Sequence, residues 1–124
     1  MSRKTRSVSR DAVLFLEDIQ TSCAKIVRFT ADRTRDEVFV DEMRFDAVLL
    51  NLHIIGEAVK NLPPEWRQKH SDVPWRAIAG LRDFVAHAYF ALDLDILWNA
   101  IREEIPQLLQ RVQRILEEEH GSIR

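Results

Sequence analysis

The stretch "FDAVLLNLHIIGEAVKNLPP", residues 45–64, decides the fold class of this chain. Its apolar residues recur at steps of three and four, which places them on one face of an α-helix. The members of this stripe are Phe45, Val48, Leu49, Leu52, Ile55, Val59 and Leu62. Two prolines, Pro63 and Pro64, follow, and proline cannot continue a helix. The stretch therefore predicts a long amphipathic helix that ends at Pro63.

Similar stripes occupy both ends of the chain. The first consists of Val8, Ala12, Leu16, Ile19, Cys23, Ile26 and Val27, and we expect its helix to begin at a cap on Ser7 or Ser9 and to run to about Thr30. The last consists of Leu94, Leu97, Trp98, Ile101, Ile105, Leu108, Leu109, Val112, Ile115 and Leu116, with Asp93 or Asp95 as its cap. Pro106 lies inside the last stripe and should kink that helix, because its ring displaces the hydrogen bond to the Arg102 carbonyl.

The segments between these stripes are also helical in character. "TRDE", residues 34–37, has the form of a capping box and predicts a short helical turn before the second long helix. A further turn is expected around Trp66, and Pro74 suits the first turn of a third helix that runs to about Phe90. No stretch alternates with the period of a strand. The sequence therefore predicts an all-α chain, an antiparallel four-helix bundle with a short extra helical turn, in one domain spanning residues 1–124.

Composition narrows the class of function. The single cysteine, Cys23, cannot form an internal disulfide, so we expect a cytoplasmic protein. No apolar run is long enough to span a membrane. The net charge of −2 does not indicate bulk attraction to nucleic acid, so any polyanion site must be local.

Most polar residues have an ordinary structural interpretation. Glu117 and His120 have the spacing of a di-iron motif but lie in a charged tail, where a solvated helix end is expected. His53 and Glu57 are four residues apart, and two ligands do not make a metal site, so a hydrogen-bonded or exposed pair is expected. His70 is expected to be exposed, Cys23 to pack in the core, and Trp66, Trp75 and Trp98 to be packing residues. We expect no metal and no cofactor.

The segment "GLRDFVAHAYF", residues 80–90, is different because Arg82, Asp83, His87 and Tyr89 interrupt an otherwise mostly apolar run. Arg82 and Tyr89 are seven residues apart and share a helix face, whereas apolar residues cover much of the remaining circumference. One bundle buries only one side of a helix. Either the polar groups are satisfied within one chain, or the helix lies in a two-fold interface where both copies converge. Spacing alone leaves both possibilities open.

The longer stretch "PWRAIAGLRDFVAHAYFALDLDILW", residues 74–98, resembles the HepT-like toxins of the HEPN superfamily. The R-x4-H-x-Y motif of that family matches as Arg82, His87 and Tyr89, and the polar residue that follows its arginine matches as Asp83. Upstream, "NLHIIGEAVKNLP" is similar to the second helix of the family. The similarity extends from Asp11 to Leu116.

The resemblance implies a homodimeric four-helix bundle that acts as a metal-independent endoribonuclease and as the toxin of a toxin–antitoxin pair. It implies Arg82 and His87 as catalytic residues and Asp83 as an auxiliary one. It also implies that a nucleotidyltransferase-type antitoxin silences the enzyme by transferring AMP to Tyr89.

The chemistry of these residues agrees with that implication. RNA supplies its own nucleophile, the 2′-OH, so cleavage needs a proton acceptor, a proton donor and a cation for the phosphorane charge. Histidine can take either proton role, and arginine matches phosphate oxygens. The main alternative is a non-catalytic dimeric helical module that binds a nucleotidyltransferase or a nucleotide. An enzyme with a bound metal is disfavoured, because the sequence offers no ligand set.

Overall fold

The computed structural model describes residues 2–83 and 94–123, and all of their regular structure is helical. The elements are α1 (Ser2–Thr30), α2 (Arg35–Val40), α3 (Glu42–Asn61), α4 (Pro64–Lys69), α5 (Trp75–Ala79), α7 (Leu94–Asn99), the π-helical turn η1 (Ala100–Glu104) and α8 (Ile105–Ile123). No strand occurs in the described ranges. The all-α prediction is confirmed for them.

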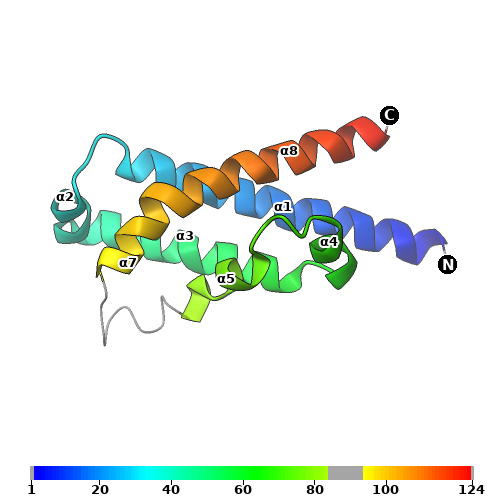
Figure 1. Ribbon diagram of the computed structural model, residues 1–124, viewed down its shortest axis with the longest axis horizontal. Coiled ribbons are helices and arrows are strands. Elements are labelled where there is room, and N and C mark those ends of the chain that lie inside the picture. Colours follow the sequence, from blue (N-terminus) through cyan, green and yellow to red (C-terminus); the bar gives the residue numbers. More distant parts are fainter. Residues whose placement is uncertain (1, 84–93, 124) are drawn as a thin grey trace.

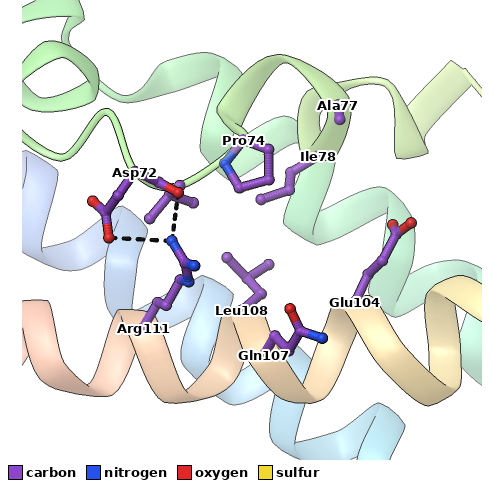
Figure 2. Close-up of a pocket in the computed structure, with 9 residues that line it drawn as sticks. Asp72, Pro74, Ala77, Ile78, Glu104, Gln107, Leu108 and Arg111 are labelled. Carbon is purple, nitrogen blue, oxygen red and sulfur yellow. Dashed lines mark hydrogen bonds and ion pairs between the residues drawn. The ribbon is translucent and has the colours of Figure 1, made fainter.

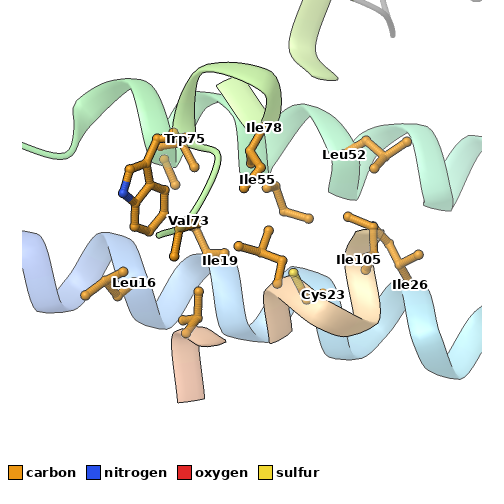
Figure 3. Close-up of a cluster of buried hydrophobic side chains, with 14 of the residues drawn as sticks. Leu16, Ile19, Cys23, Ile26, Leu52, Ile55, Val73, Trp75, Ile78 and Ile105 are labelled. Atoms are coloured by element: carbon orange, nitrogen blue, oxygen red, sulfur yellow. The ribbon is translucent and has the colours of Figure 1, made fainter. Parts of the chain in front are cut away.

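The three long helices supply most of the core. In Figure 1, α1 runs in one direction, and α3 and α8 return in the opposite one. Both pack against α1. Five residues of the predicted first stripe are buried where they meet, namely Ala12, Leu16, Ile19, Cys23 and Ile26. Figure 3 shows several of them facing side chains from α3, the connector after α4, α5 and α8.

The predicted boundaries of α1 are right at one end and wrong at the other. The helix ends at Thr30 as expected, and the Thr30 hydroxyl donates to the Ile26 carbonyl at 2.8 Å. The Arg44 guanidinium, from α3, donates to the Phe29 carbonyl at 2.6 Å and satisfies one of the free carbonyls at the helix end. The start was wrong, because α1 already begins at Ser2, so Ser7 and Ser9 lie inside the helix and are not caps.

The capping box at Thr34 is confirmed. The Glu37 amide donates to the Thr34 hydroxyl at 3.2 Å, and the Thr34 amide donates to the Glu37 carboxylate at 2.9 Å. The hydrogen bond from the Thr34 amide, with a further contribution from the Thr34 side chain, lowers the pKa of the Glu37 carboxyl group. They fix the start of α2, which places Val38 in the core.

The connector after α3 combines a correct prediction with an incorrect one. Helix α3 ends at Asn61, just before Leu62 and Pro63, and the turn expected around Trp66 is α4. His70 was expected to be exposed, but only 9% of it is accessible. Its ring lies 5.7 Å from the Trp66 ring, and its carbonyl accepts a hydrogen bond from the Trp75 indole at 3.0 Å. The expectation failed because the connector folds back onto the core at Val73 and Trp75.

The third and fourth predicted helices are described only in part. Helix α5 begins at Trp75, one residue after Pro74, and residues 81–83 are helical again. The rest of the expected Pro74–Phe90 helix lies outside the described residues, as does Asp93. The chain resumes at α7, where Asp95 lies in the first turn and pairs with Arg35 of α2.

The irregularity expected near Pro106 takes the form of the π-helical turn η1. The Ile105 amide donates to the Ala100 carbonyl, five residues back, instead of four. Pro106 has no amide hydrogen, so it cannot form the usual hydrogen bond to the preceding turn. The wider turn before it accommodates this loss, and the helix continues on both sides. The ribbon changes direction in this region of Figure 1.

Candidate active site around Arg82

The segment that follows α5 carries Arg82 to the surface of α3. Gly80 has helical backbone angles, its amide donates to the Arg76 carbonyl at 3.1 Å, and residues 81–83 are helical again. Leu81 packs against the core on one side of this segment. Arg82 is half-buried, and Asp83 is exposed.

Gly56 is what allows this segment to approach α3 so closely. A Cβ atom at Gly56 would lie 2.8 Å from the Arg82 Cβ and 2.9 Å from the Arg82 amide nitrogen, distances that real side chains do not tolerate. It would also lie 3.2 Å from the Ala79 carbonyl oxygen. Glycine in the middle of a helix costs stability relative to alanine, by about 1 kcal/mol. The close contact with Arg82 is the structural reason for glycine at this position.

Glu57, the next residue of α3, binds the Arg82 side chain. The Arg82 Nη1 atom lies 2.8 Å from the Glu57 Oε1 atom. The two side chains are 37% and 39% exposed, so the pair is open to solvent and to a ligand. A guanidinium has five N–H donors, and this contact leaves most of them for a second anion. Arg82 is thus paired with Glu57, while part of its guanidinium group stays exposed.

The contact of Glu57 with Arg82 decides between the two alternatives left open for His53 and Glu57. His53 was expected to form a hydrogen-bonded or exposed pair with Glu57, and it is exposed. However, no hydrogen bond or ion pair joins the two residues, and Glu57 contacts Arg82 instead. Sequence reasoning missed Glu57 and Gly56 as parts of this site. The one available signal was a glycine within the apolar pattern "IIGEA", since an isolated glycine in a helix often marks a close approach.

The other two motif residues, His87 and Tyr89, lie outside the described residues. The structure therefore brings Arg82 and Asp83 to one short helical segment, and the roles of His87 and Tyr89 stay predictions. Among the residues that it describes, no group of three or more histidine, cysteine or acidic side chains could hold a metal ion. Likewise, no described helix is long and apolar enough to cross a membrane.

A separate pocket of about 440 Å³ lies between α5 and α8. Its floor is apolar and includes Pro74, Ile78 and Leu108. Figure 2 shows Arg111 reaching from α8 to Asp72, whose carboxylate lies 3.1 Å from the guanidinium. Arg111 also donates to the Asp72 carbonyl. Arg111 is thus paired with a carboxylate, as Arg82 is, and Arg82 is not among the residues that line this pocket.

Cys23 is confirmed as a core residue. It is fully buried, and burial raises the pKa of its thiol to about 12. A thiol in this state is neutral at physiological pH and cannot act as a nucleophile. The tryptophans are also confirmed as packing residues, since Trp66 and Trp75 are buried and Trp98 packs edge-on against Phe39 at 5.8 Å.

Comparison with known proteins assigns this arrangement to a family. Residues 19–115, which include α3, Arg82 and most of α8, match the model of the ribonuclease HepT-like family. The chain belongs to the ribonuclease HepT-like family. The resemblance found in the motif around Arg82 is thereby confirmed.

Three relatives illustrate the membership. A protein of Caldanaerobacter subterraneus subsp. tengcongensis, provisionally named as an RNase, is 42% identical over 105 residues, which are 85% of this chain and 94% of that protein. A "Probable ribonuclease HepT" of Thermococcus cleftensis is 37% identical over 82% of this chain and 92% of its own length. A protein of Methanocaldococcus jannaschii, named as a gamma-glutamylcyclotransferase and provisionally as an RNase, is 38% identical over 88% of this chain. The match spans about half (49%) of that protein. No solved structure matches this chain significantly.

Proposed function

We propose that this HepT-like protein is a metal-independent endoribonuclease whose site is built around Arg82. Two observations carry the proposal: the chain belongs to a ribonuclease family, and Arg82 is both anchored and accessible. Its Nη1 atom lies 2.8 Å from the Glu57 carboxylate, yet 37% of its side chain is exposed. An arginine held in this way is preorganised for a phosphate. Preorganised charge is what stabilises a transition state that accumulates negative charge.

The proposed reaction is cleavage by the 2′-OH of the RNA itself. A histidine removes the 2′-OH proton, the oxygen attacks the adjacent phosphorus, and a second proton donor protonates the departing 5′-oxygen, which leaves a cyclic phosphate. We assign the proton transfers to His87 and the stabilisation of the phosphorane to Arg82. Asp83, exposed beside Arg82, is assigned an auxiliary, orienting role. We propose that the protein encounters its RNA substrate in the cytoplasm.

The assembly that we propose for this reaction is a two-fold homodimer of four-helix bundles, each comprising residues 1–124. A single histidine cannot accept and donate a proton at once, whereas a dimer supplies two. An exposed apolar stripe on α3 supports the dimer, because Met43 and Leu50 are 83% and 59% exposed and are spaced seven residues apart. Glu57 lies seven residues further along the same face. A second copy on this stripe would bring both Arg82 side chains near the two-fold axis.

Cleavage in the presence of excess EDTA tests the proposal. Purified protein should cut single-stranded or loop RNA and leave cyclic-phosphate ends, since unstacked strands can enter a narrow site. The variants Arg82→Ala and His87→Ala should each lose about 100-fold or more in rate while keeping the helical circular dichroism spectrum. Lys25→Ala, which changes an exposed cation on α1, should cleave like the parent protein. Full activity in the His87→Ala protein would refute the nuclease assignment.

We further propose that the protein is the toxin of a toxin–antitoxin pair and that its nucleotidyltransferase-type antitoxin adds AMP to Tyr89. Tyr89 shares a helix face with Arg82 if the helix continues, so a phosphodiester there would occupy the arginine and repel RNA. A phenol with a pKa near ~10 is a poor nucleophile at neutral pH, so the transfer needs an enzyme.

Mass spectrometry tests this regulation. Co-expression with a neighbouring nucleotidyltransferase should yield protein heavier by whole AMP units, mapped to Tyr89, with RNA cleavage and toxicity lost. Tyr89→Phe should escape modification and stay toxic. If the Tyr89→Phe protein is silenced as well as the parent, the partner acts by binding alone, which favours the alternative of a non-catalytic dimeric module for a nucleotidyltransferase or nucleotide.

A further inference from the structure

A shallow basic pocket of about 550 Å³ lies on the connector between α4 and α5, next to the pocket of Figure 2, with which it shares Val73, Pro74 and Ala77. Two arginines, Arg67 from α4 and Arg76 from α5, line it, and Ser71 adds a hydroxyl group. The remaining lining residues are Val73, Pro74, Trp75 and Ala77. No carboxylate is among the lining residues, so the pocket has an excess of positive charge.

Both guanidinium groups of this basic pocket lack a protein partner among the described residues. By contrast, Arg35, Arg44, Arg82 and Arg111 each pair with a carboxylate. The Arg67 Nε atom is buried and has no acceptor, and the Nε2 atom of His70, three residues later, is also buried without a partner. Buried polar groups in native proteins are almost always satisfied by protein, water or an ion. Water or an anion such as a phosphate group can supply the acceptor that this charged donor lacks.

The connector that carries the basic pocket is held rigidly. The Trp75 indole donates to the His70 carbonyl at 3.0 Å, and the Val73 amide donates to the same carbonyl at 3.1 Å. Trp75 and Val73 are themselves anchored in the core. The backbone that carries Arg67 and Arg76 is therefore ordered before any ligand arrives, which lowers part of the entropic cost of binding.

We infer that this basic pocket is a second phosphate-binding site, which holds the RNA strand beyond the phosphate that is cleaved. The identity of the ligand rests on the proposed ribonuclease function. Arg76 precedes Arg82 by six residues, and over that length a helix rises about 9 Å and turns the two side chains about 120° apart. A stacked strand rises ~3.4 Å per nucleotide, so a strand that reaches both arginines spans about three nucleotides or more and must curve around this segment. With a net charge of −2, the chain can attract RNA only through such local sites.

Binding of a strand that cannot be cleaved tests the inference separately from catalysis. The probe is a fluorescent 2′-O-methyl 12-mer, which lacks the nucleophilic 2′-OH, with the dissociation constant Kd measured at several salt concentrations. The variant Arg67→Gln/Arg76→Gln should raise Kd by about 10-fold or more, since each change removes a charge-assisted hydrogen bond. It should also reduce the slope of log Kd against log salt by about 1.4, because each phosphate contact of a single strand contributes ~0.7.

The matched control is Lys25→Gln/Arg114→Gln, which removes the same charge from exposed cations on α1 and α8. Its Kd and salt slope should stay close to those of the parent protein, and equal effects of the two double variants would overturn the inference. Cleavage of the 2′-OH strand should show a raised KM and an unchanged kcat in Arg67→Gln/Arg76→Gln, the signature of lost uniform binding.

Two further results distinguish a failure of the nuclease proposal from a failure of the RNA-binding assignment of the basic pocket. If the parent protein binds the 12-mer through both arginines but cleaves no RNA, the phosphate site stands and the nuclease proposal falls. If AMP alone binds as tightly as the 12-mer and depends on both arginines, the site takes free nucleotides and its assignment to the RNA strand is wrong.

Discussion

At the residue scale, the position of Arg82 depends on the missing side chain of Gly56. Adding a methyl group there drives it into the Cβ and the amide nitrogen of Arg82, at 2.8 and 2.9 Å. These are backbone-linked atoms, so the overlap is relieved only by moving the whole 81–83 segment away from α3. That movement would lengthen the contact between Arg82 and Glu57.

Gly56→Ala should therefore reduce both stability and activity. Overpacking costs about 1–3 kcal/mol, which exceeds the ~1 kcal/mol that alanine gains in helix propensity. We expect a net loss of roughly 1 kcal/mol in urea unfolding, with at least a 10-fold lower cleavage rate, because a misplaced charge stabilises the transition state poorly.

Gly80→Ala is the milder comparison, since Gly80 has a helical φ of −66° and an added Cβ would lie 3.2 Å from the Ala77 carbonyl oxygen, a tight contact that a small shift relieves, and would not approach Arg82. It should lose much less activity and stability than Gly56→Ala. An active, stable Gly56→Ala protein would show that the close approach does not position Arg82.

Some residue-level features could be derived from the sequence, and others could not. Arg82 was identified because its motif is local, contained in eight consecutive residues. Its partner Glu57 is 25 positions earlier, and which carboxylate an arginine meets depends on how two helices cross. His70 was misjudged for the same reason, since its burial comes from the return of the connector to the core.

At the scale of single elements, α2 depends on the capping box of Thr34 and Glu37. Thr34→Ala should cost about 1 kcal/mol of stability, since it leaves one amide of the first turn without its acceptor. The pKa of Glu37 is lowered in the folded protein, chiefly by the hydrogen bond from the Thr34 amide. Its stabilising contribution is therefore present above the ordinary carboxyl pKa of 4.5 and is lost as the pH falls through the folded value.

Melting temperatures measured between pH 3 and pH 7 test this direction of the pH dependence. Glu37→Gln should melt below the parent protein at pH 7, and the gap should close as the solution is acidified. Glu17→Gln, which changes an exposed carboxylate on α1, should show no such pattern. A gap that widens toward acid pH would contradict the assigned role of Glu37.

Elements were predictable where periodicity or a turn motif defined them. The apolar stripes located α1, α3 and α8. Pro63 located the end of α3, and Pro74 located the start of α5. The π-helical turn was not predicted as such, because the sequence shows only that Pro106 lacks an amide hydrogen, whereas the surrounding packing decides how the helix adapts.

At the scale of the whole molecule, the sequence indicates a helical chain but does not specify which outer face meets a partner. Burial identifies Met43 and Leu50 as apolar side chains that the described part of the chain leaves exposed on one face of α3. Exposed apolar side chains in a row indicate an interaction surface more strongly than isolated ones. Their alignment with Glu57 connects this surface to the site around Arg82.

Leu50→Glu tests whether that surface joins two copies. Near a two-fold axis the substitution would place two carboxylates close together, so light scattering should show the parent at twice 14.5 kDa and the variant at 14.5 kDa. The circular dichroism spectrum should stay unchanged, because Leu50 is 59% exposed and contributes little to the core of one chain. Leu14→Glu, which changes a side chain 51% exposed on α1, should remain dimeric and active.

The Leu50→Glu monomer should lose RNA cleavage, since each site would then lack the second histidine. A Leu50→Glu dimer would show that another face pairs the chains, and a monomer that cleaves at the parental rate would refute the shared site.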